Sequence, residues 1–185
     1  MTKIRRLEQG DWAHYRDIRL EMLADTPTAY VEPLESASRQ TDGQWQARTA
    51  NMVSPGNVTF VAGDAPGSGR LEALMWVALR KPQDLQRPRQ AILLSVFVAG
   101  RQRGTGLADS MLRRCIAAAR DELQADLLEL GVHEDNVRAQ RFYLRHGFRD
   151  TGRREPYPLD PAARELVMEL QLKPAADGGA AKPYG

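Results

Sequence analysis

Residues 96–108 have the sequence VFVAGRQRGTGLA, and this stretch decides the fold. An apolar run typical of a β-strand gives way to two arginines and two glycines before an amphipathic helix begins. A turn of this kind leaves several backbone N–H groups unpaired at the positive end of a helix dipole. It therefore favours binding of an anion of the size of a phosphate or pyrophosphate. The predicted phosphate-binding residues are Arg101, Arg103, Gly104, Thr105, Gly106 and Leu107.

The composition is that of a globular protein with one core. The 185 residues are 42% hydrophobic and 27% charged, an ordinary balance. A formal net charge of +2 is too mild to predict nucleic-acid binding, which favours a concentrated basic stripe. No apolar run approaches the roughly 18 residues of a membrane span, and the first residues do not resemble a signal peptide, so no membrane partner is expected. The single cysteine, Cys115, predicts a reducing, cytoplasmic setting.

Hydrophobic periodicity predicts the elements around this turn. Strands are expected at residues 3–7, 57–62, 71–79, 91–98, 126–132, 148–151 and 165–172. Helices are expected at residues 11–23, 34–40, 43–51, 106–123 and 136–146. This order predicts an α/β fold with a mixed, mostly antiparallel central sheet and helices on both faces. The strands at 91–98 and 126–132 should run parallel, joined by a right-handed crossover.

A second motif covers residues 136–148, which have the sequence NVRAQRFYLRHGF. Its anchor residues are Asn136, Ala139, Phe142, Tyr143, Gly147 and Phe148. The two motifs together are far more specific than the phosphate-binding turn alone. Together with the sequence RQRGTG at residues 101–106, this segment resembles the two cofactor motifs of the GCN5-related N-acetyltransferase (GNAT) superfamily. The resemblance is strong over residues 91–150 and extends to the rest by element order.

The resemblance implies a GNAT fold with a splayed parallel strand pair, in one N-acetyltransferase domain at residues 1–172. Residues 173–185 are rich in Ala, Gly and Pro and are expected to form a disordered tail. The implied partners are acetyl-CoA and an amine acceptor, and a homodimer through the C-terminal strands is a further expectation. The reaction implied is direct acetyl transfer to a primary amine, with a small molecule favoured as acceptor.

The resemblance also implies where the cofactor binds. Its pantetheine arm would lie between the splayed strands and pair with the backbone of Val96, Phe97 and Val98, as an added strand does. Asn136 would contact this arm. Tyr143 follows seven residues later, two helical turns along the same face, and its hydroxyl would protonate the departing thiolate.

The group that deprotonates the acceptor is less defined. A lysine-like amine has a pKa of about 10.4, and freeing it costs roughly 4 kcal/mol at pH 7.4. The strand at 91–98 contains no acid, although some GNAT members carry a Glu there. Glu129 on the next strand and Glu32 after the first helix are the candidate bases, and Tyr30 in a proline-bounded loop is the candidate acceptor contact. The histidines lack partners at metal-ligand spacing, so no metal site is predicted.

Three other functions compete with this interpretation. A Rossmann dinucleotide site is disfavoured because Asp109 stands at the third glycine position and only one βαβ unit is present. A P-loop is excluded because no Gly-Lys-Ser/Thr follows the turn. A non-catalytic acyl-CoA-binding sensor or interaction module on the same fold is the alternative, and the presence of both Asn136 and Tyr143 favours the enzyme. The acceptor stays open among antibiotic amines, polyamines, amino acids and protein amines.

Overall fold

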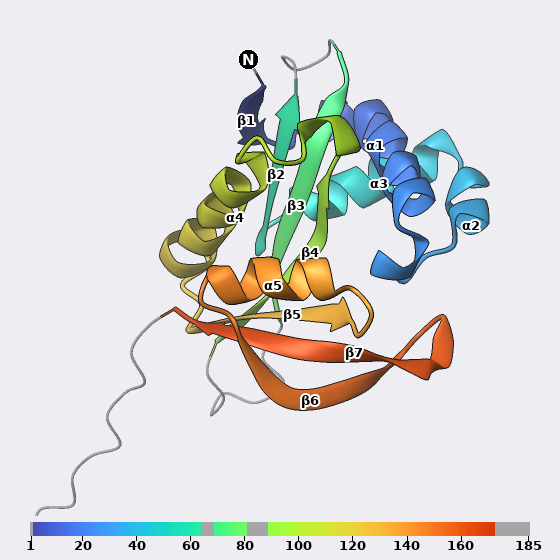
Figure 1. Ribbon diagram of the computed structural model, residues 1–185. Helices are drawn as coiled ribbons and strands as arrows, with labels where there is room; N and C mark the ends of the chain where they lie inside the picture. Colours follow the sequence, from blue (N-terminus) through green and yellow to red (C-terminus); the bar gives the residue numbers. More distant parts are fainter. Residues whose placement is uncertain (1, 64–68, 81–88, 173–185) are drawn as a thin grey trace, which may run out of the picture.

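Seven strands form one mixed sheet in the order β1-β2-β3-β4-β5-β7-β6 (Figure 1). Their bounds are β1 Lys3–Arg6, β2 Asn57–Gly63, β3 Leu71–Leu79, β4 Gln90–Val98, β5 Leu127–His133, β6 Arg149–Tyr157 and β7 Asp160–Gln171. All neighbouring pairs are antiparallel except β4 and β5. This arrangement confirms the predicted mixed, mostly antiparallel sheet.

The computed structural model describes residues 2–63, 69–80 and 89–172. Most of the connection between the strands predicted at 57–62 and 71–79, most of the connection from there to the strand predicted at 91–98, and the predicted tail at 173–185 therefore lie outside the described residues.

Helices cover both faces of the sheet, as predicted. They are α1 Trp12–Asp25, α2 Leu34–Ser38, α3 Asp42–Met52, α4 Leu107–Ala117 and α5 Val137–Arg145, with short turns η1 Gln9–Asp11, η2 Pro27–Ala29, η3 Gly100–Gln102 and η4 Ala118–Glu122. Figure 1 shows α4 and the group of α1 to α3 on opposite sides of the central strands. Ile18 and Trp45 belong to the core under α1 and α3, whereas Met111 and Tyr143 belong to the core under α4 and α5. Each helix thus buries one apolar stripe against the sheet.

The parallel pair is short, and its strands then separate. Gln90–Ile92 of β4 pair with Leu127–Glu129 of β5, and the rest of these two strands do not pair with each other. The register between β3 and β4 shifts by one residue near Ser95, whose φ is 52°. This geometry is a β-bulge, which bends its strand and increases the twist. The bulge turns β4 away from β5 beyond Ile92, and the predicted splayed pair is confirmed.

The C-terminal hairpin is longer than predicted, since β6 continues to Tyr157 and β7 already begins at Asp160. The hairpin contains Pro156 and Pro161, a residue type that central strands exclude. However, β6 is an edge strand, and β5 pairs with β7 only over residues 165–171. A proline that lacks an N–H therefore removes little from the ladder in this part of the hairpin.

The starts and ends of two predicted helices also differ. Asp11 precedes α1 but makes no capping bond to it. Its carboxylate instead accepts from Arg5 Nη1 at 2.6 Å and from the Glu8 N–H at 2.8 Å, which ties β1 to the loop that follows it. The helix expected at 106–123 is α-helical only from Leu107 to Ala117 and ends in the π-helical turn η4.

Candidate functional site

The separation of β4 from β5 opens a cleft of about 870 Å³. This volume lies in the range of small-molecule and cofactor sites. Of the predicted site residues, the cleft brings together Tyr30, Val96, Phe97, Val98, Arg103, Gly104, Gly106, Asn136 and Tyr143. It does not bring to its walls Glu32, Arg101, Thr105, Leu107 or Glu129.

One end of the cleft is a turn of free backbone donors in front of α4. Gly104 and Gly106 have φ values of 81° and 84°, which L side chains rarely adopt. A Cβ at either position would meet no atom within 4 Å, so the approach to the backbone is open. Within the described part of the chain, no acceptor takes the N–H of any residue from 104 to 109. These donors lie at the positive end of α4, where an anion is favoured, and the turn is called the anion site below.

Arg101 turns away from this anion site, which corrects the prediction that its charge faces a phosphate. Its Nη1 lies 2.8 Å from Glu21 Oε1, and its Nε lies 2.5 Å from Glu72 Oε2. These ion pairs fasten the turn to α1 and to the start of β3. The side chains of Thr105 and Leu107 also point elsewhere, because Thr105 Oγ1 donates to Gln102 O at 2.8 Å and Leu107 packs in the core.

Three other arginines supply positive charge on the cleft walls. Arg103 lines the cleft, donates from Nε to Val98 O at 3.1 Å and pairs with Asp25. Arg138 and Arg145 of α5 line it as well. Neither was predicted, because the family motif marks these positions as variable.

Asn136 and Tyr143 meet the cleft from α5. Asn136 Oδ1 accepts from the Ala139 N–H at 3.1 Å and caps the helix, which leaves the N–H donors of its amide for other partners. Tyr143 is 6% exposed, and burial raises the pKa of its hydroxyl above the ordinary value of 10.0. The phenol is therefore protonated throughout the neutral range.

Tyr30 lines the cleft and is held by hydrogen bonds. Its hydroxyl donates to Val96 O at 2.9 Å, and its own carbonyl accepts from Tyr157 Oη at 3.1 Å. The guanidinium of Arg19 lies over its ring, 5.3 Å from the centroid, and Arg19 also lines the cleft. The cleft wall at Tyr30 thus combines an aromatic ring and a cation.

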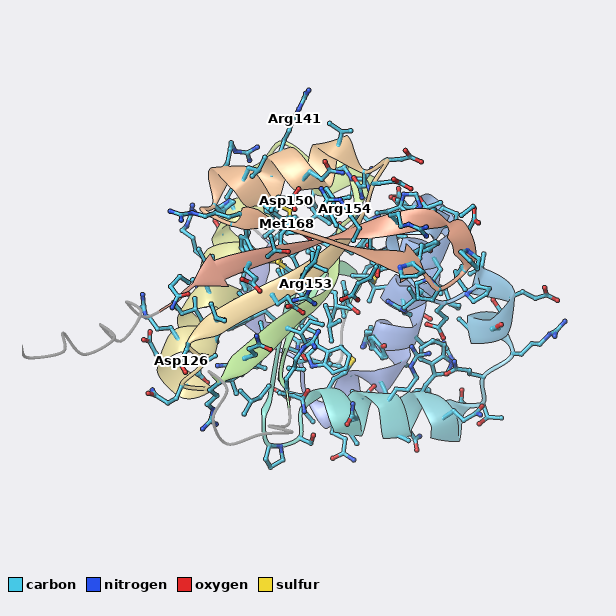
Figure 2. The ribbon with its side chains drawn as sticks, turned by 90° about the horizontal axis from the view of Figure 1, so that it is seen from below. Asp126, Arg141, Asp150, Arg153, Arg154 and Met168 are labelled. Atoms are coloured by element: carbon cyan, nitrogen blue, oxygen red, sulfur yellow. The ribbon has the colours of Figure 1, made fainter. Side chains whose placement is uncertain are left out.

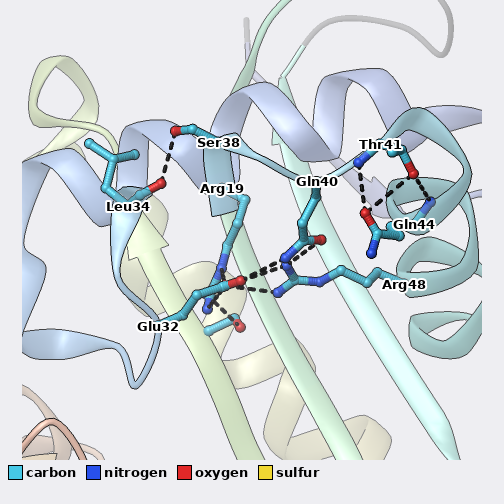
Figure 3. A network of polar contacts seen from close by, with 9 residues as sticks. Arg19, Glu32, Leu34, Ser38, Gln40, Thr41, Gln44 and Arg48 are labelled. Atoms are coloured by element: carbon cyan, nitrogen blue, oxygen red, sulfur yellow. Dashed lines mark hydrogen bonds and ion pairs between the residues drawn. The ribbon is translucent and has the colours of Figure 1, made fainter. Parts of the chain in front are cut away.

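Glu32 does not face the cleft, because it is enclosed by two arginines and a glutamine (Figure 3). It accepts from Arg19 Nη2 at 2.9 Å, from Arg48 Nη1 at 2.8 Å and from Gln40 Nε2 at 3.0 Å. Burial raises the pKa of this carboxyl, but the hydrogen bonds from Arg48 and Arg19 outweigh it and hold the pKa below 4.5. Glu32 therefore positions Arg19, whose Nη1 lies 3.4 Å from Ser95 Oγ, and is a poor proton acceptor.

Glu129 also belongs to an ion-pair cluster and not to the cleft. It is 3% exposed, with Oε1 2.6 Å from Arg80 Nη2 and Oε2 3.0 Å from Arg153 Nη1. Figure 2 shows Arg153 extending from β6 over the neighbouring strands. Since β4 and β5 are still paired at Glu129, this residue lies before the point where the strands separate. Both carboxylates predicted to act as the general base are thus ion-paired with arginines.

The cleft also contains His133 and Glu165, which the sequence analysis did not propose for the site. They face each other in the antiparallel register of β5 and β7. The predicted final strand began at residue 165, but its partner strand and register cannot be obtained from a local pattern.

Among residues 2–63, 69–80 and 89–172, no group of three or more His, Cys, Asp or Glu side chains is placed to hold a metal ion. No helix of these segments combines the length and apolar character needed to cross a membrane.

Comparisons with known proteins agree with this geometry. A model of the Acetyltransferase (GNAT) family matches residues 20–148. The curated L-amino acid N-acetyltransferase AaaT from Escherichia coli (strain K12) is 28% identical over 161 residues, which cover 84% of this chain and 88% of that protein.

Solved structures share the fold. The structure of yncA from Salmonella typhimurium with acetyl-CoA has a TM-score of 0.75 and 20% identity, and covers 98% of this chain and 99% of its own. The spermidine N-acetyltransferase from Vibrio cholerae, in complex with CoA and spermine, has a TM-score of 0.66 and 17% identity, and covers 92% of this chain and 95% of its own.

Proposed function

The chain belongs to the Acetyltransferase (GNAT) family, and we propose that it transfers the acetyl group of acetyl-CoA directly to the primary amine of a small molecule. The observation that supports this most is the cleft between β4 and β5, which has an anion site of free N–H groups at one end. A cofactor with a diphosphate and a long polar arm fits such a cleft. Both substrates would bind together, so no acyl-enzyme is needed, and Cys115 is fully buried.

Each part of the cleft then has a role toward the cofactor, whose thioester supplies the acetyl group when bound. The N–H groups of residues 104–109, with Arg103, hold the diphosphate. The edge of β4 from Val96 to Val98, which β5 does not pair with, and the amide of Asn136 orient the arm, although Val96 O and Val98 O already accept from Tyr30 and Arg103. Tyr143 supplies a proton to the departing sulfur.

For the acceptor, we propose a compound that carries a carboxylate beside its amine, as an amino acid does. Arg19, Arg48 and Glu32 together have a net charge of +1, and Arg19 brings this charge to the cleft. A buried positive charge attracts a carboxylate and repels a polyamine. The similarity to an L-amino acid N-acetyltransferase supports the same class of acceptor.

The test compares three acceptors with the same carbon side chain: L-leucine, L-leucinamide and isoamylamine. Acetyl-CoA is added to the purified protein, released thiol is followed with a chromogenic reagent, and the product is identified by mass. We expect L-leucine to be acetylated faster than isoamylamine. Arg19→Gln should reduce this preference about tenfold to a hundredfold, because a hydrogen bond to a charged group contributes about 1.5–3 kcal/mol. An unchanged preference would exclude Arg19 as the carboxylate contact.

The same experiment tests the sensor alternative. Tight acetyl-CoA binding without thiol release for amino acids, polyamines or peptide N-termini would favour a binding module over an enzyme. The cytoplasmic setting and the homodimer stay predictions, the first from the single cysteine and the second from the family resemblance.

A further inference from the structure

A proton acceptor near the acceptor amine must be a group that arginines do not already neutralise. The cleft walls contain two carboxylates, Asp109 and Glu165. Asp109 lies 2.8 Å from His146 Nε2 and 3.4 Å from Arg145 Nη2, at the start of α4 and beside the anion site. Among the described residues, neither a hydrogen-bond donor nor a cation is paired with the Glu165 carboxylate.

The strand register sets the direction of the Glu165 side chain. Glu165 of β7 is opposite His133 of β5. Paired residues of antiparallel strands project to the same face, and Gly131, two residues before His133, is on that face too. A Cβ added to Gly131 would lie 3.3 Å from Glu165 Oε2, so the carboxylate lies directly across Gly131. Gly131 is exposed and lines the cleft, which leaves the carboxylate at the open wall.

The surroundings of Glu165 favour proton uptake. Burial raises the pKa of its carboxyl above 4.5, the charge of Glu155 raises it further, and His133 opposes the shift. The titratable groups that face it are His133 from β5 and Glu155 and Tyr157 from β6. A carboxylate whose pKa moves toward neutrality is a better general base than one fixed by arginines.

We propose that Glu165 binds the ammonium group of the acceptor and takes the proton that must leave before acetyl transfer. This assignment rests on the proposed function. One proton passes from R–NH₃⁺ to the Glu165 carboxylate. The neutral amine then forms the C–N bond to the acetyl carbon as the C–S bond breaks, and the second proton of the nitrogen replaces the one that Tyr143 gives to sulfur. The products are the N-acetyl compound and CoA thiol, and Glu165 returns one proton to solvent.

The experiment compares Glu165→Gln with Glu155→Gln in the full chain. The two residues face each other across β6 and β7, but Glu155 is exposed and does not line the cleft. Measurements are kcat/KM for L-leucine from pH 5.5 to 9.5, acetyl-CoA affinity by calorimetry, and thermal unfolding. We expect Glu165→Gln to lower kcat/KM at pH 7 by about 10²-fold or more. Acetyl-CoA affinity should be unchanged, and the unfolding temperature should not fall, because the substitution removes an unpaired half-buried charge. Activity should partly recover at high pH, where the free amine is abundant.

Glu155→Gln should keep its activity and move the acid limb of the profile to lower pH, because it removes a negative neighbour from Glu165. A Glu165→Gln protein with nearly wild-type kcat/KM and an unaltered profile would overturn the assignment and leave the proposed function intact. A wild-type protein that transfers acetyl to none of the amines, so that no thiol is released, would overturn both.

Discussion

Glu32→Gln is the substitution that separates a positioning role from a catalytic one. The carboxylate of Glu32 accepts from Arg19 and Arg48 through four N–H contacts of 2.8–3.0 Å, and its side chain is only 16% exposed. Removing one partner of a fully buried ion pair costs about 3–5 kcal/mol. Because Arg48 is 29% exposed, we discount this to about 2–3 kcal/mol. At about 2–4 °C per kcal/mol, the unfolding temperature should fall by roughly 4–12 °C.

The pH dependence gives the sign of the same effect. The pKa of Glu32 in the folded protein lies below its ordinary value of 4.5. Its stabilisation is therefore fully present above that ordinary value and is lost as the pH falls through the folded-state pKa. The wild-type and Glu32→Gln unfolding temperatures should differ at pH 7.5 and converge in acid. Glu35→Gln is the matched control, since Glu35 is 75% exposed and pairs with an equally exposed Arg39.

Kinetics complete the test. With Arg19 no longer held, KM for L-leucine should rise by about tenfold, the loss expected for one weakened charged hydrogen bond, and the acid limb of kcat should not move. A Glu32→Gln variant with the same unfolding temperature as the wild type would refute the stability argument. A collapse of kcat with unchanged KM and a displaced acid limb would show that Glu32 is the base after all.

Three further substitutions test the part of the cleft proposed to bind the cofactor, and one labelling experiment tests the core under α4. Gly104→Ala and Gly104→Glu share the cost of a Cβ at positive φ, about 1–2 kcal/mol, but only the carboxylate should abolish acetyl-CoA binding in calorimetry; retained affinity in the Glu variant would contradict the phosphate site. Tyr143→Phe should lower kcat by about 10²-fold while acetyl-CoA affinity is kept, and unchanged turnover would remove Tyr143 as the acid. Burial raises the pKa of Cys115 to about 12, so a thiol reagent should label it only after unfolding, and rapid labelling of the folded protein would show that the α4 core opens.

Residues whose roles depend on local chain geometry could be predicted from the sequence. Gly104 and Gly106 stand between an apolar run and a helix, and both adopt the left-handed conformation that frees the backbone. Asn136 and Tyr143 are two turns apart on one short helix, so they reach the same cleft. The strands at 57–63 and 71–79 likewise follow from their own hydrophobic pattern.

Roles that depend on long-range pairing could not be predicted in this way. Glu129 alternates with the buried Leu128 and Leu130, which fixes its face but does not reveal that Arg80 and Arg153 converge on it. The side chain of Arg101 turns to carboxylates far away in the sequence. A motif specifies the backbone that holds the cofactor, whereas the register of distant strands decides which acids remain free.

Pairing itself therefore identifies the functional acid. The sequence has 26 Lys and Arg residues against 24 Asp and Glu residues, so cations are available to neutralise most carboxylates. Glu32 and Glu129 are neutralised by arginines, as are Glu21 and Glu72 near the turn. A half-buried carboxylate without a partner destabilises the fold, and local violations of this kind occur where function requires them. At Glu165 the missing cation is supplied only when an ammonium group enters the cleft, and proton transfer then removes both charges together.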